Sequence, residues 1–124
     1  MKNVTLKPFS ENGFKIDLIE NKYLITNAGF QLPAEALFIG KKIFCKPLEG
    51  QPEQEHNAKI LNDLKYATIS KNITINSINN WLHSSKKIKI DFPDPLELII
   101  DIIEDKDKKF SYEIDKLWQI KKTY

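Results

Sequence analysis

The chain of 124 residues contains no arginine, because all 19 of its basic residues are lysines. Arginine reads guanine and phosphate through paired hydrogen bonds, so its absence argues against sequence-specific nucleic-acid recognition. The formal net charge is only +2, and the lysines and acids are balanced in both halves of the chain. Without a basic half to serve as an electrostatic footprint, we expect no nucleic-acid partner.

Cysteine and long apolar runs are also scarce. Cys45 is the single cysteine, which excludes an internal disulfide. It lies in an apolar segment, where we expect a small buried hydrophobe rather than a nucleophile. No apolar run is long enough to predict a membrane span, and residues 1–10 lack the apolar segment of a secretory signal. These features predict a cytoplasmic protein.

What the chain does have is the balance of a soluble globular domain, with 41% hydrophobic and 29% charged residues. Short apolar segments that end in turn residues predict about four strands. They are residues 3–9, 23–26, 43–45 and 67–69. The apolar runs at 23–26 and 43–45 are typical of strands that are buried on both faces. Each is followed by a segment with helical spacing of apolar residues. For the first and last of these helices we expect the N-caps Ser10 and Asn76, and Gly40 has the position of a helix-ending glycine.

This alternation of strands and helices predicts a Rossmann-like α/β fold, a three-layer arrangement with helices on both faces of a parallel sheet. Right-handed crossovers place every strand-to-helix loop at one edge of such a sheet, and ligands bind there. We expect residues 1–90 to form this domain and residues 91–124 to form a helical C-terminal extension. A capping-box pattern at residues 94–97 opens the extension. Residues 110–124 suit a strand or a helix, and we favour a helix.

Candidate binding residues gather at the expected strand-to-helix loops. Small residues at Ala28 and Gly29 let a backbone approach a ligand closely, and the following helix start favours phosphate. Glu35, one turn into that helix, has a carboxylate that can accept hydrogen bonds from sugar hydroxyls. Glu53 and Gln54 begin the next helix at the same edge. Taken singly, these residues are more commonly a turn, a solvated charge and ordinary helix-start chemistry.

Their order and spacing, however, form a pattern over residues 26–58. Its elements are Thr26, Ala28-Gly29, Glu35-Ala36, Gly40, Pro47, Glu53-Gln54 and Asn57-Ala58. This pattern resembles the donor-sugar-binding half of GT-B glycosyltransferases. In particular, it is similar to the C-terminal domain of family-28 enzymes and related UDP-glycosyltransferases. Ala34 departs from that family, since many members carry a serine there.

The resemblance implies a site for a nucleotide-diphosphate sugar, with UDP as the expected nucleotide. Four backbone positions would hold the diphosphate: Ala28, Gly29, Phe30 and Gln31. Glu35 would hold the ribose hydroxyls, and Glu53 and Gln54 would contact the transferred sugar. The implied reaction is a hexosyltransferase-type transfer to an acceptor hydroxyl. Helix amides would stabilise the leaving diphosphate, and we expect no bound metal or other cofactor.

The acceptor site and the usual catalytic base of such enzymes belong to an N-terminal domain that this sequence does not contain. We therefore assign no catalytic residue and expect the chain to be a part or subunit of a two-domain enzyme, incomplete by itself. The alternative is a truncated, non-catalytic remnant that acts as a protein-interaction module. An exposed edge strand in a truncated sheet would then offer a route to a homodimer.

Overall fold

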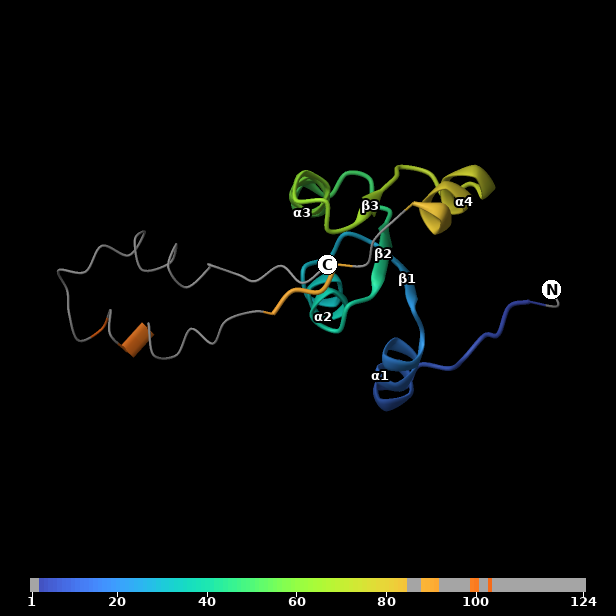
Figure 1. Ribbon diagram of the computed structural model, residues 1–124, viewed down its shortest axis with the longest axis horizontal. Coiled ribbons are helices and arrows are strands. Elements are labelled where there is room, and N and C mark those ends of the chain that lie inside the picture. The colour runs from blue at the N-terminus through green and yellow to red at the C-terminus, as the bar shows by residue number, and fades with distance from the viewer. Residues whose placement is uncertain (1–2, 85–87, 92–98, 101–102, 104–124) are drawn as a thin grey trace.

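A computed structural model describes residues 3–84, 88–91, 99–100 and 103 of the chain. Helices and strands alternate through this part (Figure 1). In order they are α1 (Glu11–Glu20), β1 (Tyr23–Thr26), α2 (Gln31–Phe38), β2 (Lys42–Cys45), α3 (Pro52–Asp63), β3 (Thr68–Ile69) and α4 (Ile75–His83). The expected Rossmann-like α/β class is confirmed. None of the helices described is both long and apolar enough to cross a membrane.

The described sheet has three parallel strands in the order β1-β2-β3 rather than the four expected. The prediction of a strand at residues 3–9 was wrong, because this segment has no regular secondary structure. Its apolar side chains lie in solvent, with Leu6 91% and Phe9 98% exposed. Proline at position 8 lacks a backbone N–H. With no neighbouring strand to bond and no core to enter, the segment gains nothing from strand pairing.

Helices lie on both faces of the sheet, as expected (Figure 1). Successive side chains of β2 alternate between these faces. Ile43 and Cys45 enter the main core, which includes Leu37 of α2 and Leu61 of α3. Phe44 faces the other way and meets Trp81 of α4 edge to face, with ring centroids 5.6 Å apart. The central strand thus joins two separate packing layers.

The two strands that looked alike in sequence differ in burial. β2 is buried at Ile43, Phe44 and Cys45, as predicted. We expected β1 to be buried on both faces as well, and this was wrong: Tyr23 is 51% and Ile25 48% exposed. β1 is an edge strand, and α4 covers only part of the face that these two side chains share, where Tyr23 meets Trp81 edge to face with ring centroids 5.6 Å apart.

Caps explain where several helices begin and end. The Ser10 hydroxyl accepts a hydrogen bond from the Gly13 N–H at 3.1 Å, which confirms the predicted N-cap of α1. Gly40 ends α2 with a φ of 72°, a conformation that glycine adopts without steric cost. The N-cap of α4, however, is Thr74 and not Asn76, because Thr74 and Ser77 form a reciprocal capping box.

After α4 the described chain returns to the main core. Ile90 is 2% exposed, and its N–H donates to the Leu37 carbonyl at 3.2 Å. Of residues 91–124, where we expected a helical extension, the structure describes Asp91, Ile99, Ile100 and Ile103, and the last three have helical backbone. The capping-box pattern at 94–97 and the ambiguous segment 110–124 lie outside the described residues. The division at residue 90 therefore stays a prediction.

Candidate functional site

The predicted binding residues all lie at or near the carboxyl edge of the sheet, where β1 ends at Thr26 and β2 ends at Cys45. α2 and α3 begin at this edge, so their N-terminal amides face the same side of the molecule (Figure 1). Parallel strands joined by right-handed crossovers place the helix starts there. The expectation of a shared edge is therefore met by the topology.

The turn 27–30 between β1 and α2 is held from two directions. The Gly29 N–H donates to Asn27 Oδ1 at 3.2 Å, and Asn57 Nδ2 of α3 donates to the Ala28 carbonyl at 3.2 Å. Ala28 is completely buried. A Cβ added at Gly29 would lie 3.3 Å from Asn27 Oδ1, so a side chain there would crowd the turn. The backbone of this turn is thus fixed before any ligand arrives.

α2 begins without a side-chain cap. Its N-cap is Phe30, which has helical backbone angles and a ring that is 77% exposed. Among the described residues, no side chain accepts a hydrogen bond from the first amides of this helix. The amides of Gln31 and Leu32 therefore stand at the positive end of the helix dipole. Pro33 supplies no amide, which limits the donors at this start to the first two residues.

Glu35 and Gln31 lie next to one another on α2. Gln31 Nε2 donates to Glu35 Oε1 at 2.8 Å, and both side chains are exposed. The hydrogen bond orients the carboxylate toward the N-terminal turn of the helix. Glu35 also borders a shallow apolar hollow between α1 and α2. The structure therefore brings Glu35 close to the amides of the α2 start.

Glu53 and Gln54 begin α3 but have different surroundings. Glu53 is exposed in the first turn. Gln54 is used within the chain, since its Oε1 accepts from the Leu48 N–H at 3.1 Å and its Nε2 donates to Gln51 Oε1 at 3.2 Å. This side chain holds the loop after β2. Of the two, only Glu53 has a side chain that faces solvent without such bonds in the described part of the chain.

A hollow of about 640 Å³ opens at the same edge, between α3 and the loops that follow β2 and β3. Its lining includes Leu48, Glu55, Ser70 and Lys71, and none of the seven predicted site residues. The loops supply half of this wall, and loop shape has no periodic signature in a sequence. We also assigned no role to Asn57, although the dipeptide Asn57-Ala58 is part of the pattern over residues 26–58. The structure shows that Asn57 anchors the turn at Ala28.

Cys45 is a free cysteine buried in the main core. Burial raises the pKa of the Cys45 thiol to about 12, so the thiol is protonated at neutral pH. This confirms the predicted buried hydrophobe, because the thiolate is the reactive form. Among the residues that the structure describes, no group of three or more His, Cys, Asp or Glu side chains could hold a metal ion.

A parallel sheet whose helix starts gather at its carboxyl edge defines a Rossmann-like domain. A family model described as glycosyl transferase family 1 matches residues 1–85. The chain therefore belongs to that family, which confirms the expected glycosyltransferase relationship. No curated protein and no solved structure matches the chain. The finer likeness to family-28 enzymes and the preference for UDP stay predictions.

Proposed function

We propose that the chain binds a nucleotide-diphosphate sugar, with UDP as the nucleotide, as the donor-binding part of a two-domain GT-B glycosyltransferase. The observation that carries this proposal is the uncapped start of α2 beside the anchored turn 27–30, in a chain of glycosyl transferase family 1. Free amides at the positive end of a helix dipole are a natural partner for a diphosphate.

The site residues take distinct roles in this proposal. The backbone of Ala28, Gly29, Phe30 and Gln31 binds the diphosphate. Glu35, oriented by Gln31, accepts hydrogen bonds from the ribose hydroxyls. Glu53 contacts the transferred sugar, and Gln54 supports it by holding the loop at Leu48.

The reaction is transfer of the sugar from its diphosphate to an acceptor hydroxyl. The amides at the α2 start stabilise the charge that develops on the leaving diphosphate. The acceptor and the catalytic base come from a separate acceptor-binding domain or subunit. In this proposal the chain works in the cytoplasm.

An NMR titration of the ¹⁵N-labelled chain with UDP-glucose tests donor binding. We expect saturable amide shifts that cluster at Gly29–Gln31, Glu35 and Glu53, with UDP alone shifting the first group. Gly29→Ala should weaken binding, because the added methyl crowds the turn near Asn27. The φ of Gly29 does not require glycine, so we expect the variant to keep the fold. Saturable shifts confined to the far side of the sheet would refute the proposal.

A second candidate, the protein-interaction module, is favoured by one observation. β1 is an edge strand with the half-exposed side chains Tyr23 and Ile25 on one face. Such an edge can pair with a second copy of the chain. Light scattering over a range of concentrations discriminates the two candidates. A dimer that ignores UDP-glucose supports the module, whereas a monomer that binds UDP-glucose supports the donor domain.

A further inference from the structure

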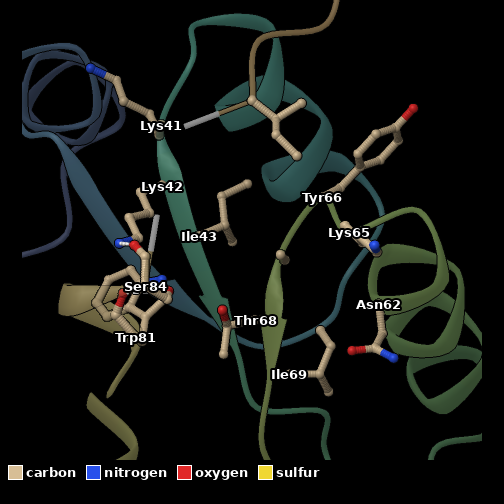
Figure 2. A pocket seen from close by; sticks show the side chains of 12 residues that line it. Lys41, Lys42, Ile43, Asn62, Lys65, Tyr66, Thr68, Ile69, Trp81 and Ser84 are labelled. Carbon is tan, nitrogen blue, oxygen red and sulfur yellow. Dashed lines mark hydrogen bonds between the residues drawn. The ribbon is translucent and has the colours of Figure 1, made fainter. Parts of the chain in front are cut away.

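The two edges of the sheet are protected to different degrees. At one edge, β3 is only two residues long, and a strand this short offers little backbone for pairing. Figure 2 shows this short strand with Thr68 turned toward Trp81 of α4 and Ile69 turned toward α3. At the other edge, β1 is as long as β2, and no strand of the described residues pairs with its outer side. β1 is therefore the open edge of the sheet.

Two residues of β1 present backbone groups to this open edge. On the inner side, the carbonyls of Lys22 and Thr26 accept hydrogen bonds from β2 at 3.1 and 2.9 Å. Alternate residues of a parallel strand bond to opposite neighbours, so the N–H and carbonyl groups of Tyr23 and Ile25 point outward. β1 contains neither a proline nor a charged residue, which are common means of protecting an edge from pairing. The edge is therefore suited to accept a further strand.

The same chain carries a segment that has the pattern of a strand but no strand partner among the described residues. In residues 3–9, called the arm from here on, Val4 and Leu6 alternate with polar residues, so both would lie on one face of a strand. Val4 is 56%, Leu6 91% and Phe9 98% exposed. Apolar side chains that gather in solvent in this way are typical of an interaction site.

The arm does not lie along β1 of its own chain. Lys7 Nζ pairs with Asp17 of α1 at 2.5 Å, and the Ser10 hydroxyl fixes the start of α1. From there the arm extends beyond β1 at one end of the molecule (Figure 1). The arm and the open edge are thus at the same end. Two copies that face each other with these ends can each receive the arm of the other, and such an exchange of identical elements is a common route to dimers.

α1 extends the apolar surface at this end. It has no buried residue, and Phe14 and Ile16 are 47% and 54% exposed. An open hollow of about 590 Å³ separates α1 from the base of the arm, and its lining includes Phe9 and Phe14. A helix of ten residues depends on packing for its stability. Contact with a second copy at this end would therefore also complete the packing of α1.

We propose that two copies of this chain exchange their arms, so that the arm of each copy pairs as an added strand with the outer edge of β1 of the other. Val4 and Leu6 then cover Tyr23 and Ile25, and the outward backbone groups of these two β1 residues gain partners. The two β1 strands do not pair with each other, which distinguishes this arrangement from the direct pairing of two edges.

The exchange uses eleven residues of each copy, seven in the arm and four in β1. Stable interfaces commonly use about 20 to 30 residues a side. We therefore expect a weak dimer, with a dissociation constant of about 10 to 100 μM. None of the seven predicted donor residues belongs to the arm or to β1, so the exchange does not rest on the proposed donor function.

Analytical ultracentrifugation of the full chain, from about 1 μM to about 1 mM, measures the dimer. Leu6→Asp and Ile25→Asp should each raise the dissociation constant at least about tenfold, because each places a charge between the arm and the edge. Both side chains are exposed in the single chain, by 91% and 48%, so these variants keep the monomer fold. Ile75→Asp is the matched control, because Ile75 is 81% exposed at the start of α4, and it should leave the dissociation constant unchanged.

Disulfide formation between variants identifies the contact. The native Cys45 is buried and protonated, so it does not compete. Chains with Leu6→Cys are mixed under oxidising conditions with chains that carry Tyr23→Cys or Ile25→Cys. We expect covalent dimers of mixed composition with at least one of these two partners, depending on the direction of the added strand, and none with Ile75→Cys chains.

Three outcomes would overturn the proposal. The first is a full chain that stays monomeric up to about 1 mM. The second is a dimer that Ile75→Asp weakens as much as Ile25→Asp does. The third is a dimer in which Tyr23→Cys or Ile25→Cys chains link among themselves and never to Leu6→Cys chains, since the two β1 edges would then pair directly.

Discussion

The helices of this chain begin in two different ways. α1 and α4 are capped by their own side chains, Ser10 in one and the Thr74–Ser77 box in the other. α2 and α3, the two helices that connect the strands, begin at Phe30 and Gln51 without a side-chain cap. The capped starts are therefore complete in themselves, whereas the other two leave backbone donors for another partner.

The difference separates helix starts that serve stability from helix starts that are available to a ligand. A capped start gains about 1 kcal/mol of stability from its side chain. Natural proteins leave many such gains unused, and functional sites are one place where local structural rules are broken. The three helices that follow a strand, α2, α3 and α4, all begin at the carboxyl edge, where Rossmann-like folds bind their ligands, and of these α2 and α3 have no side-chain cap. The missing caps therefore support the proposed donor site, and this support can be tested residue by residue.

The largest effect should come from a charge placed at the uncapped start of α2. Phe30→Asp puts a carboxylate beside the amides that are proposed to hold the diphosphate. Like charges a few ångströms apart near a protein surface repel by several kcal/mol. We expect the affinity for UDP-glucose, measured by calorimetry, to fall about 100-fold, or about 2.7 kcal/mol.

The stability of the same variant should change in the opposite direction. An acid at a helix N-terminus adds about 0.3 to 1 kcal/mol to the free energy of unfolding. Phe30 is 77% exposed, so its replacement leaves no cavity. Phe30→Asn is the matched uncharged control and should keep most of the affinity. Equal affinity of Phe30→Asp and the parent chain would show that the diphosphate does not bind at α2.

At α4 we expect the opposite result, a loss of stability with no change in affinity, because the cap of α4 serves stability alone. Thr74→Ala removes the hydroxyl that accepts from the Ser77 N–H at 3.1 Å. The free energy of unfolding, measured with urea, should fall by about 1 kcal/mol. Thr74→Ser keeps a hydroxyl at the cap and should therefore keep most of the parent chain's free energy of unfolding. UDP-glucose affinity should be the same in all three chains, and a parallel loss of affinity would place α4 in the donor site.

How far the sequence could predict this arrangement depends on the kind of information involved. β2 was predicted because its apolar run reflects burial on both faces, which is a local property of the chain. β1 has a similar run, yet it lies at an edge. Which strand becomes the edge is decided by how many neighbours the sheet acquires, and no single segment encodes that number. The same reason explains residues 3–9, whose alternating apolar side chains have no strand to pair with.

The candidate site shows the same limit. The position of Glu35 and of the turn at Ala28 and Gly29 near the carboxyl edge could be predicted from the order of strands and helices along the chain, while their role in binding stays a prediction. The engagement of Gln54 with Leu48 could not be predicted, since it depends on the path of a loop.

A smaller effect is expected at Glu35, within the first turns of the uncapped helix α2. Glu35→Gln keeps the size of the side chain and an oxygen that can accept from Gln31 Nε2. It loses the charge that strengthens hydrogen bonds to ribose hydroxyls. We expect UDP-glucose affinity to fall about fivefold, the difference between a charged and a neutral acceptor. Glu20→Gln, an exposed acid at the end of α1, is the control and should change nothing.

The smallest effect separates the two uncapped starts from each other. Gln51 has extended backbone angles, with φ −112° and ψ 95°, and these suit a serine N-cap. Gln51→Ser should therefore raise the free energy of unfolding by about 0.5 kcal/mol, with Gln51→Ala as the uncapped reference. In the proposed function no amide of α3 binds the diphosphate, so this new cap on α3 should leave UDP-glucose affinity unchanged within about twofold, or about 0.4 kcal/mol. A larger loss would mean that the α3 amides also contact the donor, and both uncapped starts would then belong to the site.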